Sequence, residues 1–188
     1  MSRAEPTSKK ASMAGFAIDL DHLRRNARAH IEEGPITEAY GADRDRVVAV
    51  LNEVLATELV CVLRYKRHYY MAEGLESAPV AQEFLQHANE EQGHADRIAQ
   101  RIVQLQGAPD FNPATLVARS HAEYAEGSDL VDMIKEDLVA ERVAIASYQE
   151  IIRWLDDADP TTRRLMEDIL VVEEEHADEL VSFLKQLG

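Results

Sequence analysis

The chain has 188 residues, of which 46% are hydrophobic and 29% are charged, so it is long enough for one domain with a sizeable core and an appendage. Its composition, rich in Ala, Leu, Glu and Arg with only 6% aromatic residues, favours helices over a β-sandwich. The net charge of −15 argues against a protein that coats nucleic acid and favours one that attracts cations.

Cysteine content and hydropathy exclude further classes. The single cysteine, Cys61, excludes an intrachain disulfide and any metal framework built from several thiolates. No window approaches the length of a membrane-spanning apolar segment, so we predict no contact with a membrane. The N-terminal residues show no continuous apolar region of a secretory signal, and the expected location is therefore the cytoplasm.

Residues 1–42 are predicted to form an N-terminal appendage. Residues 1–15 are small, polar and interrupted by Gly and Pro, and we expect a disordered tail there. Residues 17–32 can form a short amphipathic helix with an apolar side between Ile18 and Ile31. Gly34 should end this helix.

Residues 43–188 are predicted to form a bundle of four long helices. The expected helices cover residues 43–72, 79–106, 129–157 and 160–187. Gly74 should stop the first helix, Pro79 and Pro160 suit the first turns of the second and fourth, and Asp159 should cap the fourth. Each helix is about 42 Å long at about 1.5 Å per residue. The loops within the first and the last pair of helices are short. The long connection 107–128 between the second and third helices predicts an all-α, ferritin-like four-helix bundle with one crossover.

Each of these four helices carries a glutamate on the face that is otherwise apolar. Between Leu51 and Tyr69 the apolar residues follow a spacing of three and four, and Glu58 falls on the same stripe. The equivalent residues of the other three helices are Glu91, Glu141 and Glu173. His94 and His176 follow one turn after the acids of the second and fourth helices, on the same face.

Buried carboxylates without partners are too costly for a core, so these four require neutralisation. We expect no buried Lys or Arg on the stripes near them. Two divalent cations would balance four carboxylates, and each cation would gain one neutral imidazole. Oxygen-rich ligation with little nitrogen and no thiolate favours iron or manganese over structural zinc.

An internal repeat supports this metal site. The segment 91–96 reads EQGHAD and the segment 173–178 reads EEEHAD, so both contain Glu-x-x-His-Ala-Asp. A single Glu-x-x-His arises by chance in charged helices, but two copies in register with two further core glutamates indicate a metal centre. The sequence therefore predicts two copies of one ligand-bearing hairpin that meet at one level of the bundle.

These motifs, together with LNEVLATELVCVLRY at residues 51–65, resemble the ferritin-like superfamily, and within it the bacterioferritins and the Dps-like ferritins. The resemblance covers about residues 45–187. It implies oxidation of Fe²⁺ by O₂ or H₂O₂ at a pair of irons (manganese being the alternative metal), followed by iron storage or detoxification. The implied roles are terminal carboxylates for Glu58 and Glu141, bridging carboxylates for Glu91 and Glu173, terminal imidazoles for His94 and His176, and a tyrosine beside the site for Tyr65.

Three departures from the family pattern carry expectations of their own. Gln92 stands where haem-binding bacterioferritins have a methionine, so we expect no haem. Cys61 stands alone, whereas Dps-like ferritins tend to have a cysteine pair near the metals. The few residues after His176 complete the last helix and leave none for the fifth helix of 24-subunit ferritins, so we expect a homo-oligomeric shell of 12 subunits.

Several other residues have less specific interpretations. Tyr65, two turns from Glu58, is expected to hydrogen-bond at the site, whereas Tyr148 is expected to pack in the core with a satisfied hydroxyl. His87 faces inwards and is interpreted as a hydrogen-bonded core histidine, with a supporting or ligand role at the metals as the alternative. Cys61 is interpreted as a small buried apolar residue.

Two alternative functions remain open at this stage. A manganese catalase-like or other di-metal oxidoreductase would use the same six ligands without storing iron. A Dps-type protein that shields DNA is supported only by the basic tail, where Arg3, Lys9 and Lys10 outnumber Glu5. The acidic remainder of the chain opposes that role, and we expect no DNA binding.

Overall fold

The computed structural model describes residues 17–72 and 77–187, and every regular element in these ranges is a helix. The chain separates into two compact units, residues 1–38 and residues 39–188. No helix in the described ranges is long and apolar enough to cross a membrane. The predicted disordered tail lies outside the described residues.

The first unit contains the predicted amphipathic helix, α1 (Leu20–Ala29), followed by the short 3-10 helix η1 (Ile31–Glu33). Asp19 caps α1 by accepting a hydrogen bond from the backbone N–H of His22 at 2.9 Å. The α-helix ends earlier than expected because the chain tightens into η1 before Gly34, whose φ of 63° ends the segment. No residue of α1 is buried.

The second unit contains the four predicted long helices, whose ends agree with the expected ends within two residues. They are α2 (Arg44–Met71), α3 (Ala78–Gln104), α5 (Leu130–Leu155) and α6 (Pro160–Leu187). The agreement follows from local capping, since Asp43 and Asp159 accept backbone hydrogen bonds at the starts of α2 and α6. The predicted stop at Gly74 lies outside the described residues.

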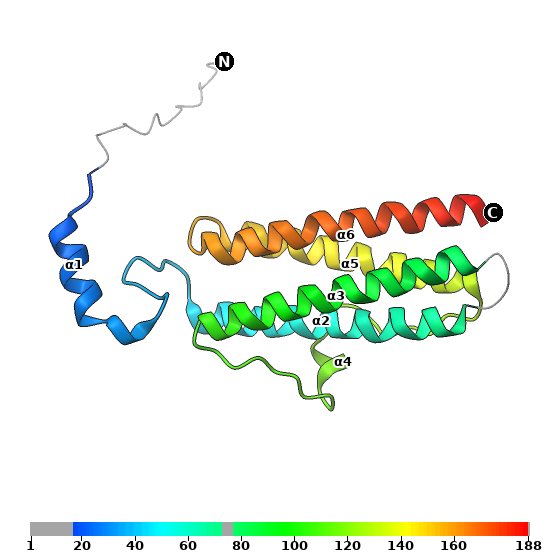
Figure 1. Ribbon diagram of the computed structural model, residues 1–188, viewed down its shortest axis with the longest axis horizontal. Helices are drawn as coiled ribbons and strands as arrows, with labels where there is room; N and C mark the ends of the chain where they lie inside the picture. Colours follow the sequence, from blue (N-terminus) through cyan, green and yellow to red (C-terminus); the bar gives the residue numbers. More distant parts are fainter. Residues whose placement is uncertain (1–16, 73–76, 188) are drawn as a thin grey trace, which may run out of the picture. The chain divides into compact units, whose positions relative to one another are not determined.

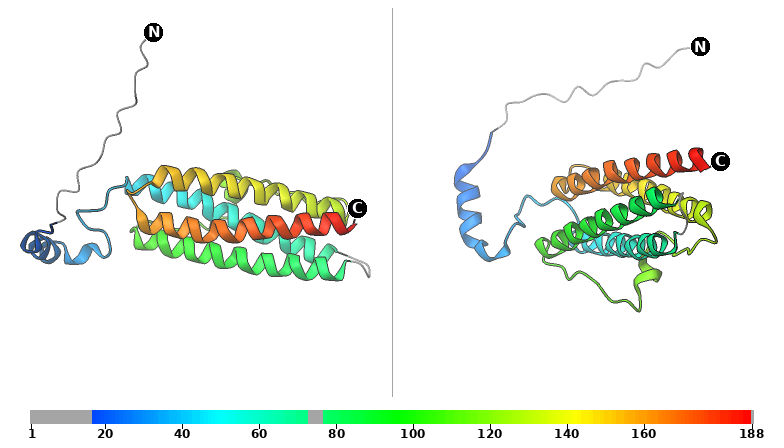
Figure 2. Two further views of the ribbon diagram at one scale, coloured as in Figure 1. Left: turned by 90° about the horizontal axis from the view of Figure 1, so that it is seen from above. Right: turned by 45° about the vertical axis from the view of Figure 1, so that its right-hand side comes forward.

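The helices form an antiparallel pair α2–α3 and an antiparallel pair α5–α6, side by side along one axis (Figures 1 and 2). The crossover between α3 and α5 returns along the outside of the bundle, so that α5 starts at the end where α3 started (Figure 1). This confirms the one-crossover topology. The crossover also contains a short helix that was not predicted, α4 (Leu116–Arg119), whose Leu116 packs against Ala56 and Val60 of α2.

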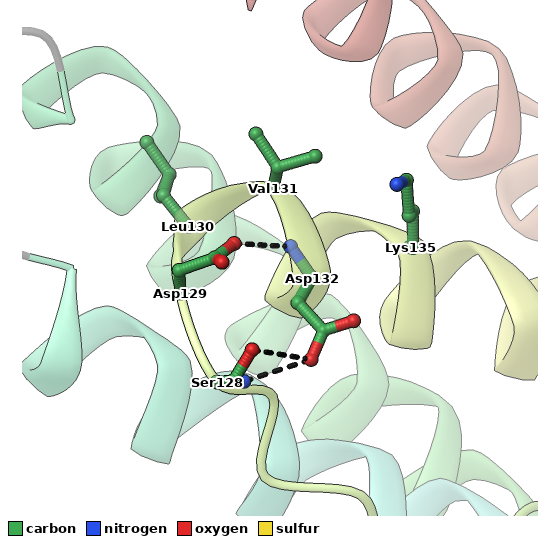
Figure 3. Close-up of a pocket in the computed structure, with 6 residues that line it drawn as sticks. All are labelled: Ser128, Asp129, Leu130, Val131, Asp132 and Lys135. Atoms are coloured by element: carbon green, nitrogen blue, oxygen red, sulfur yellow. Dashed lines mark hydrogen bonds between the residues drawn. The ribbon is translucent and has the colours of Figure 1, made fainter.

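The start of α5 is fixed by reciprocal hydrogen bonds (Figure 3). The Asp129 side chain accepts the backbone N–H of Asp132 at 2.9 Å. The Asp132 carboxylate in turn accepts the backbone N–H and the hydroxyl of Ser128, at 2.8 and 3.0 Å, and these bonds lower the pKa of Asp132. The arrangement is a variant of the capping box and sets the register of the helix that carries Glu141.

A buried ion pair joins α2 to α5. The Arg64 guanidinium donates to Asp137 at 2.7 Å and to the backbone oxygen of Glu123 in the crossover at 3.1 Å. His68 Nδ1 lies 2.8 Å from the other carboxylate oxygen of Asp137. Arg64 lies beside the predicted stripe of α2 and pairs with Asp137, so it does not contradict the expectation of no buried Lys or Arg on the stripes near the four glutamates. Arg64 is buried, and its charge is taken up by Asp137, a further buried acid that was not identified from the sequence.

Candidate metal centre

The structure brings the six predicted ligands together inside the second unit. One acid comes from each long helix because each lies on the stripe that its helix turns towards the core. All six side chains are buried, with at most 5% of each residue exposed. The six are Glu58 of α2, Glu91 and His94 of α3, Glu141 of α5, and Glu173 and His176 of α6.

These side chains form two overlapping sets that could each hold a metal ion. The first set is Glu58, Glu91, His94 and Glu173, and the second is Glu91, Glu141, Glu173 and His176. Within each set the ligand atoms lie within 4.8 Å of one another. Glu91 and Glu173 belong to both sets, which is the placement required of carboxylates that bridge two ions. Each set retains one glutamate and one histidine of its own.

In the first set, the His94 ring lies among three carboxylates. Its Nδ1 is 3.2 Å from Glu58, 3.3 Å from Glu91 and 3.0 Å from Glu173. Burial opposes a charge on His94, but the hydrogen bonds to Glu58 and Glu91 outweigh it and raise the pKa of His94 to about 10. Without a metal, a proton on His94 therefore balances part of the negative charge.

In the second set, His176 has the protonation state of a metal ligand. Burial lowers the pKa of His176 to about 4, so its imidazole is neutral at physiological pH. Nε2 lies 2.8 Å from the partly exposed carboxylate of Glu90, which can accept a hydrogen bond from an N–H at this position. The lone pair is then on Nδ1, which is 3.8 Å from Glu141 and 3.9 Å from Glu91.

Unsatisfied polar atoms at the centre match what a cation would bind. Buried polar groups nearly always have a hydrogen-bond partner, and exceptions need a physical reason. Among the described residues, the buried side-chain atoms without one are Glu91 Oε1, Glu141 Oε2, Glu173 Oε1, His176 Nδ1 and His87 Nδ1. Four of the five belong to predicted ligands, and the residues present therefore fit a pair of divalent cations.

Two tyrosines hydrogen-bond to the two glutamates that the sets do not share. The Tyr65 hydroxyl donates to Glu141, and the Tyr148 hydroxyl donates to Glu58 at 2.5 Å. Tyr65 therefore hydrogen-bonds at the site as expected, and its partner belongs to another helix, because the hydroxyl reaches across from α2 to α5. Tyr148 has the satisfied hydroxyl that was predicted, but its partner is a site carboxylate, which the sequence analysis missed. The available signal was spacing, since each tyrosine follows the glutamate of its own helix by seven residues.

Other singled-out residues lie beside the centre. His87 faces inwards as expected and is fully buried, with its ring stacked on that of His176 at a centroid distance of 3.9 Å. Cys61 is buried, and burial raises the pKa of its thiol well above the usual value, which agrees with an inert core residue. Gln92 is directed away from the core, and its amide donates to Asp96 at 3.0 Å.

The fold and this centre define a helical bundle protein with a carboxylate-rich core. A family model described as the ferritin-like domain matches residues 48–188, and the chain belongs to this family.

Three known proteins show the extent of the similarity. A bacterioferritin of Rhodobacter capsulatus is 29% identical over 147 residues, which cover 76% of this chain and 87% of that protein. A DNA-binding protein of Nostoc sp., described as induced by nutrient stress, is 32% identical over 139 residues, covering 71% of this chain and 74% of the other. The dodecameric thioferritin of Bacteroides fragilis superposes with a TM-score of 0.75 at 32% identity, covering 78% of this chain and 89% of that one.

The titration of the centre leads to a pH-dependent prediction. Burial and the neighbouring carboxylates raise the pKa values of Glu91 and Glu173 well above the usual range. In the metal-free native protein these two groups keep protons that the unfolded chain releases, so their contribution to the free energy of unfolding falls as the pH rises above about 4.5. A Mn²⁺ ion bound by these carboxylates would replace the protons, so the increase in Tm on adding Mn²⁺ should be larger at about pH 7.5 than at about pH 5.5.

Calorimetry with and without Mn²⁺ at the two pH values measures this difference. The double variant Glu91→Gln/Glu173→Gln should lose most of the Mn²⁺ effect at both pH values. The control Glu174→Gln removes an exposed charge next to Glu173 and should behave like the wild type. An equal Mn²⁺ effect at both pH values would show that the ion does not displace protons from this centre.

Proposed function

We propose that this protein oxidises Fe²⁺ at the buried centre and retains the ferric product within a homo-oligomeric shell. The observation that carries the proposal is the pair of overlapping ligand sets that share Glu91 and Glu173. Membership of the ferritin-like family and the similarity to bacterioferritins support iron as the substrate. Carboxylate-rich ligation with one imidazole per ion suits iron and also suits manganese.

Paired binding would match the chemistry of the oxidant. Two Fe²⁺ ions together supply two electrons, which reduce one H₂O₂ to two hydroxide ions or one O₂ and two protons to H₂O₂. Glu91 and Glu173 would hold the two ions together, while Glu58 with His94 and Glu141 with His176 would complete the two sites. Tyr148 and Tyr65 would keep Glu58 and Glu141 in position through their hydrogen bonds.

Anaerobic titration with Fe²⁺, followed by addition of O₂ or H₂O₂, tests the proposal. We expect a pair of Fe²⁺ ions per subunit at the buried centre, oxidation on mixing, and ferric iron that stays with the protein through gel filtration. A manganese catalase-like enzyme would instead evolve O₂ from H₂O₂ without accumulating iron. That outcome would contradict ferroxidase activity and favour a di-metal oxidoreductase that stores no iron.

Haem is not part of the proposed cofactor set. The residue at the position of the haem-binding methionine is Gln92, and its side chain bonds to Asp96 on its own helix. DNA protection is not proposed either, although the Nostoc relative is described as a DNA-binding protein. The net charge of −15 would repel the phosphate backbone at physiological salt.

The proposed assembly is a shell of 12 copies. Support comes from the Bacteroides fragilis thioferritin, which is described as dodecameric and shares 32% identity and a TM-score of 0.75 with this chain. Light scattering of the purified protein should give about 253 kDa, twelve times the subunit mass of 21.1 kDa. A mass near twice that value would indicate a 24-subunit shell. A dimer would leave no enclosed space for stored iron.

A further inference from the structure

A second group of metal-ligand side chains lies next to the buried centre. His87 lies one turn after Glu83 on α3, and Glu179 faces both residues from α6. His87 Nε2 is 3.0 Å from Glu179 Oε2 and 3.5 Å from Glu83 Oε1. The three residues offer ligand atoms within 4.8 Å of one another, and none of them is among the six predicted ligands.

This group lies between the solvent and the buried metal centre. The side chains of Glu83 and Glu179 are 22% and 35% exposed, whereas His87 is fully buried. The His87 ring stacks on the ring of His176, which belongs to the second ligand set. An ion held by the two carboxylates would therefore have water on one side and the wall of the centre on the other.

The electrostatics of the group favour a cation. The carboxylates of Glu83 and Glu179 are close enough to share a hydrogen bond, and burial together with the charge of Glu179 raises the pKa of Glu83. Two adjacent carboxylates can share one proton or be neutralised by a divalent ion. With a divalent ion, the two carboxylates and a neutral imidazole give a site of zero net charge.

The buried ring of His87 can adopt the tautomer that such an ion requires. Its Nδ1 has no hydrogen-bond partner, and the same is true of Glu141 Oε2. His87 and Glu141 also offer ligand atoms within 4.8 Å of each other. A proton on Nδ1 would be directed to this carboxylate by a small side-chain adjustment, and the lone pair on Nε2 would then face Glu83 and Glu179.

We propose that Glu83, His87 and Glu179 form a third cation site in each subunit, which takes a divalent transition metal ion. Because the two carboxylates are reached by solvent and the imidazole adjoins the centre, this site loads the buried pair. The loading role rests on the proposed ferroxidase function, whereas binding of an ion does not.

Zn²⁺ binding to the purified, assembled protein tests the site without any redox reaction. Calorimetric titration of the double variant Glu83→Gln/Glu179→Gln should show one Zn²⁺ ion per subunit fewer than the wild type. The control Glu174→Gln/Glu175→Gln removes two exposed charges from the same region of α6 and should retain the full number. Anomalous scattering from Zn²⁺-soaked crystals should show a peak at His87 Nε2. Equal Zn²⁺ numbers for variant and wild type would overturn the proposal.

Iron kinetics test the loading role separately. With Fe²⁺ below saturation, the Glu83→Gln/Glu179→Gln variant should oxidise iron several-fold more slowly than the wild type and reach the same final extent. Unchanged kinetics in a variant that has lost its Zn²⁺ site would overturn the loading role. If the wild type itself oxidised no iron, the ferroxidase proposal would fail while the Zn²⁺ result still decided whether the site exists.

Discussion

Replacing Glu173 by glutamine should reduce the number of Fe²⁺ ions bound anaerobically at the buried centre of each subunit from two to at most one. Glu173 belongs to both ligand sets, so the substitution removes a charged ligand from both sites at once. Loss of residues that merely support ligands typically lowers activity about 10–100-fold. Loss of a shared ligand should therefore slow oxidation by at least about 100-fold, measured by stopped-flow absorbance after addition of H₂O₂.

The neighbouring residue provides a matched control for this experiment. Glu174→Gln makes the same chemical change one residue along α6, where the side chain is exposed, and should leave both capacity and rate unchanged. Glu91→Gln should reproduce the effect of Glu173→Gln, because Glu91 is the other residue common to the two sets. A strong defect in Glu174→Gln with a normal Glu173→Gln variant would mean that the inward face of α6 has been assigned incorrectly.

The fold was predictable because its determinants are local. The three-and-four spacing of apolar residues defines the helices, and caps such as Asp43, Asp129 and Asp159 define where they begin. Six glutamates and histidines on the apolar stripes could be identified for the same reason, since a stripe position in a long helix determines which way a side chain points. The length of the crossover then distinguished the one-crossover bundle from a simple up-and-down arrangement.

Contacts between helices were not predictable to the same degree. The bond from Tyr65 to Glu141 and the bond from Tyr148 to Glu58 depend on how α2 and α5 align along the bundle axis. Periodicity within one helix carries no information on that alignment. The ligand group at Glu83, His87 and Glu179 was missed for a related reason, because two of its members are partly exposed and resemble ordinary surface acids.

The buried pair of Arg64 and Asp137 shows what such cross-helix contacts contribute to stability. Both side chains are at most 1% exposed, and Arg64 also bonds to the crossover. Arg64→Met would leave the Asp137 carboxylate in the core with His68 as its remaining partner in this network. Breaking a buried pair in this way typically costs about 3–5 kcal/mol of the free energy of unfolding. Because His68 still contacts Asp137, we expect a loss of about 3 kcal/mol.

Arg67 on the same helix is the matched control, because its ion pair with Glu126 is exposed, with 28% and 61% of the two side chains accessible. Arg67→Met should change the free energy of unfolding by at most about 1 kcal/mol. Denaturant unfolding at one fixed protein concentration compares the variants, since assembly makes apparent stability depend on concentration. Adding Asp137→Leu to Arg64→Met should restore much of the lost stability by removing the unpaired charge. If Arg64→Met were no more destabilising than Arg67→Met, the buried pair would not be what holds α5 and the crossover to α2.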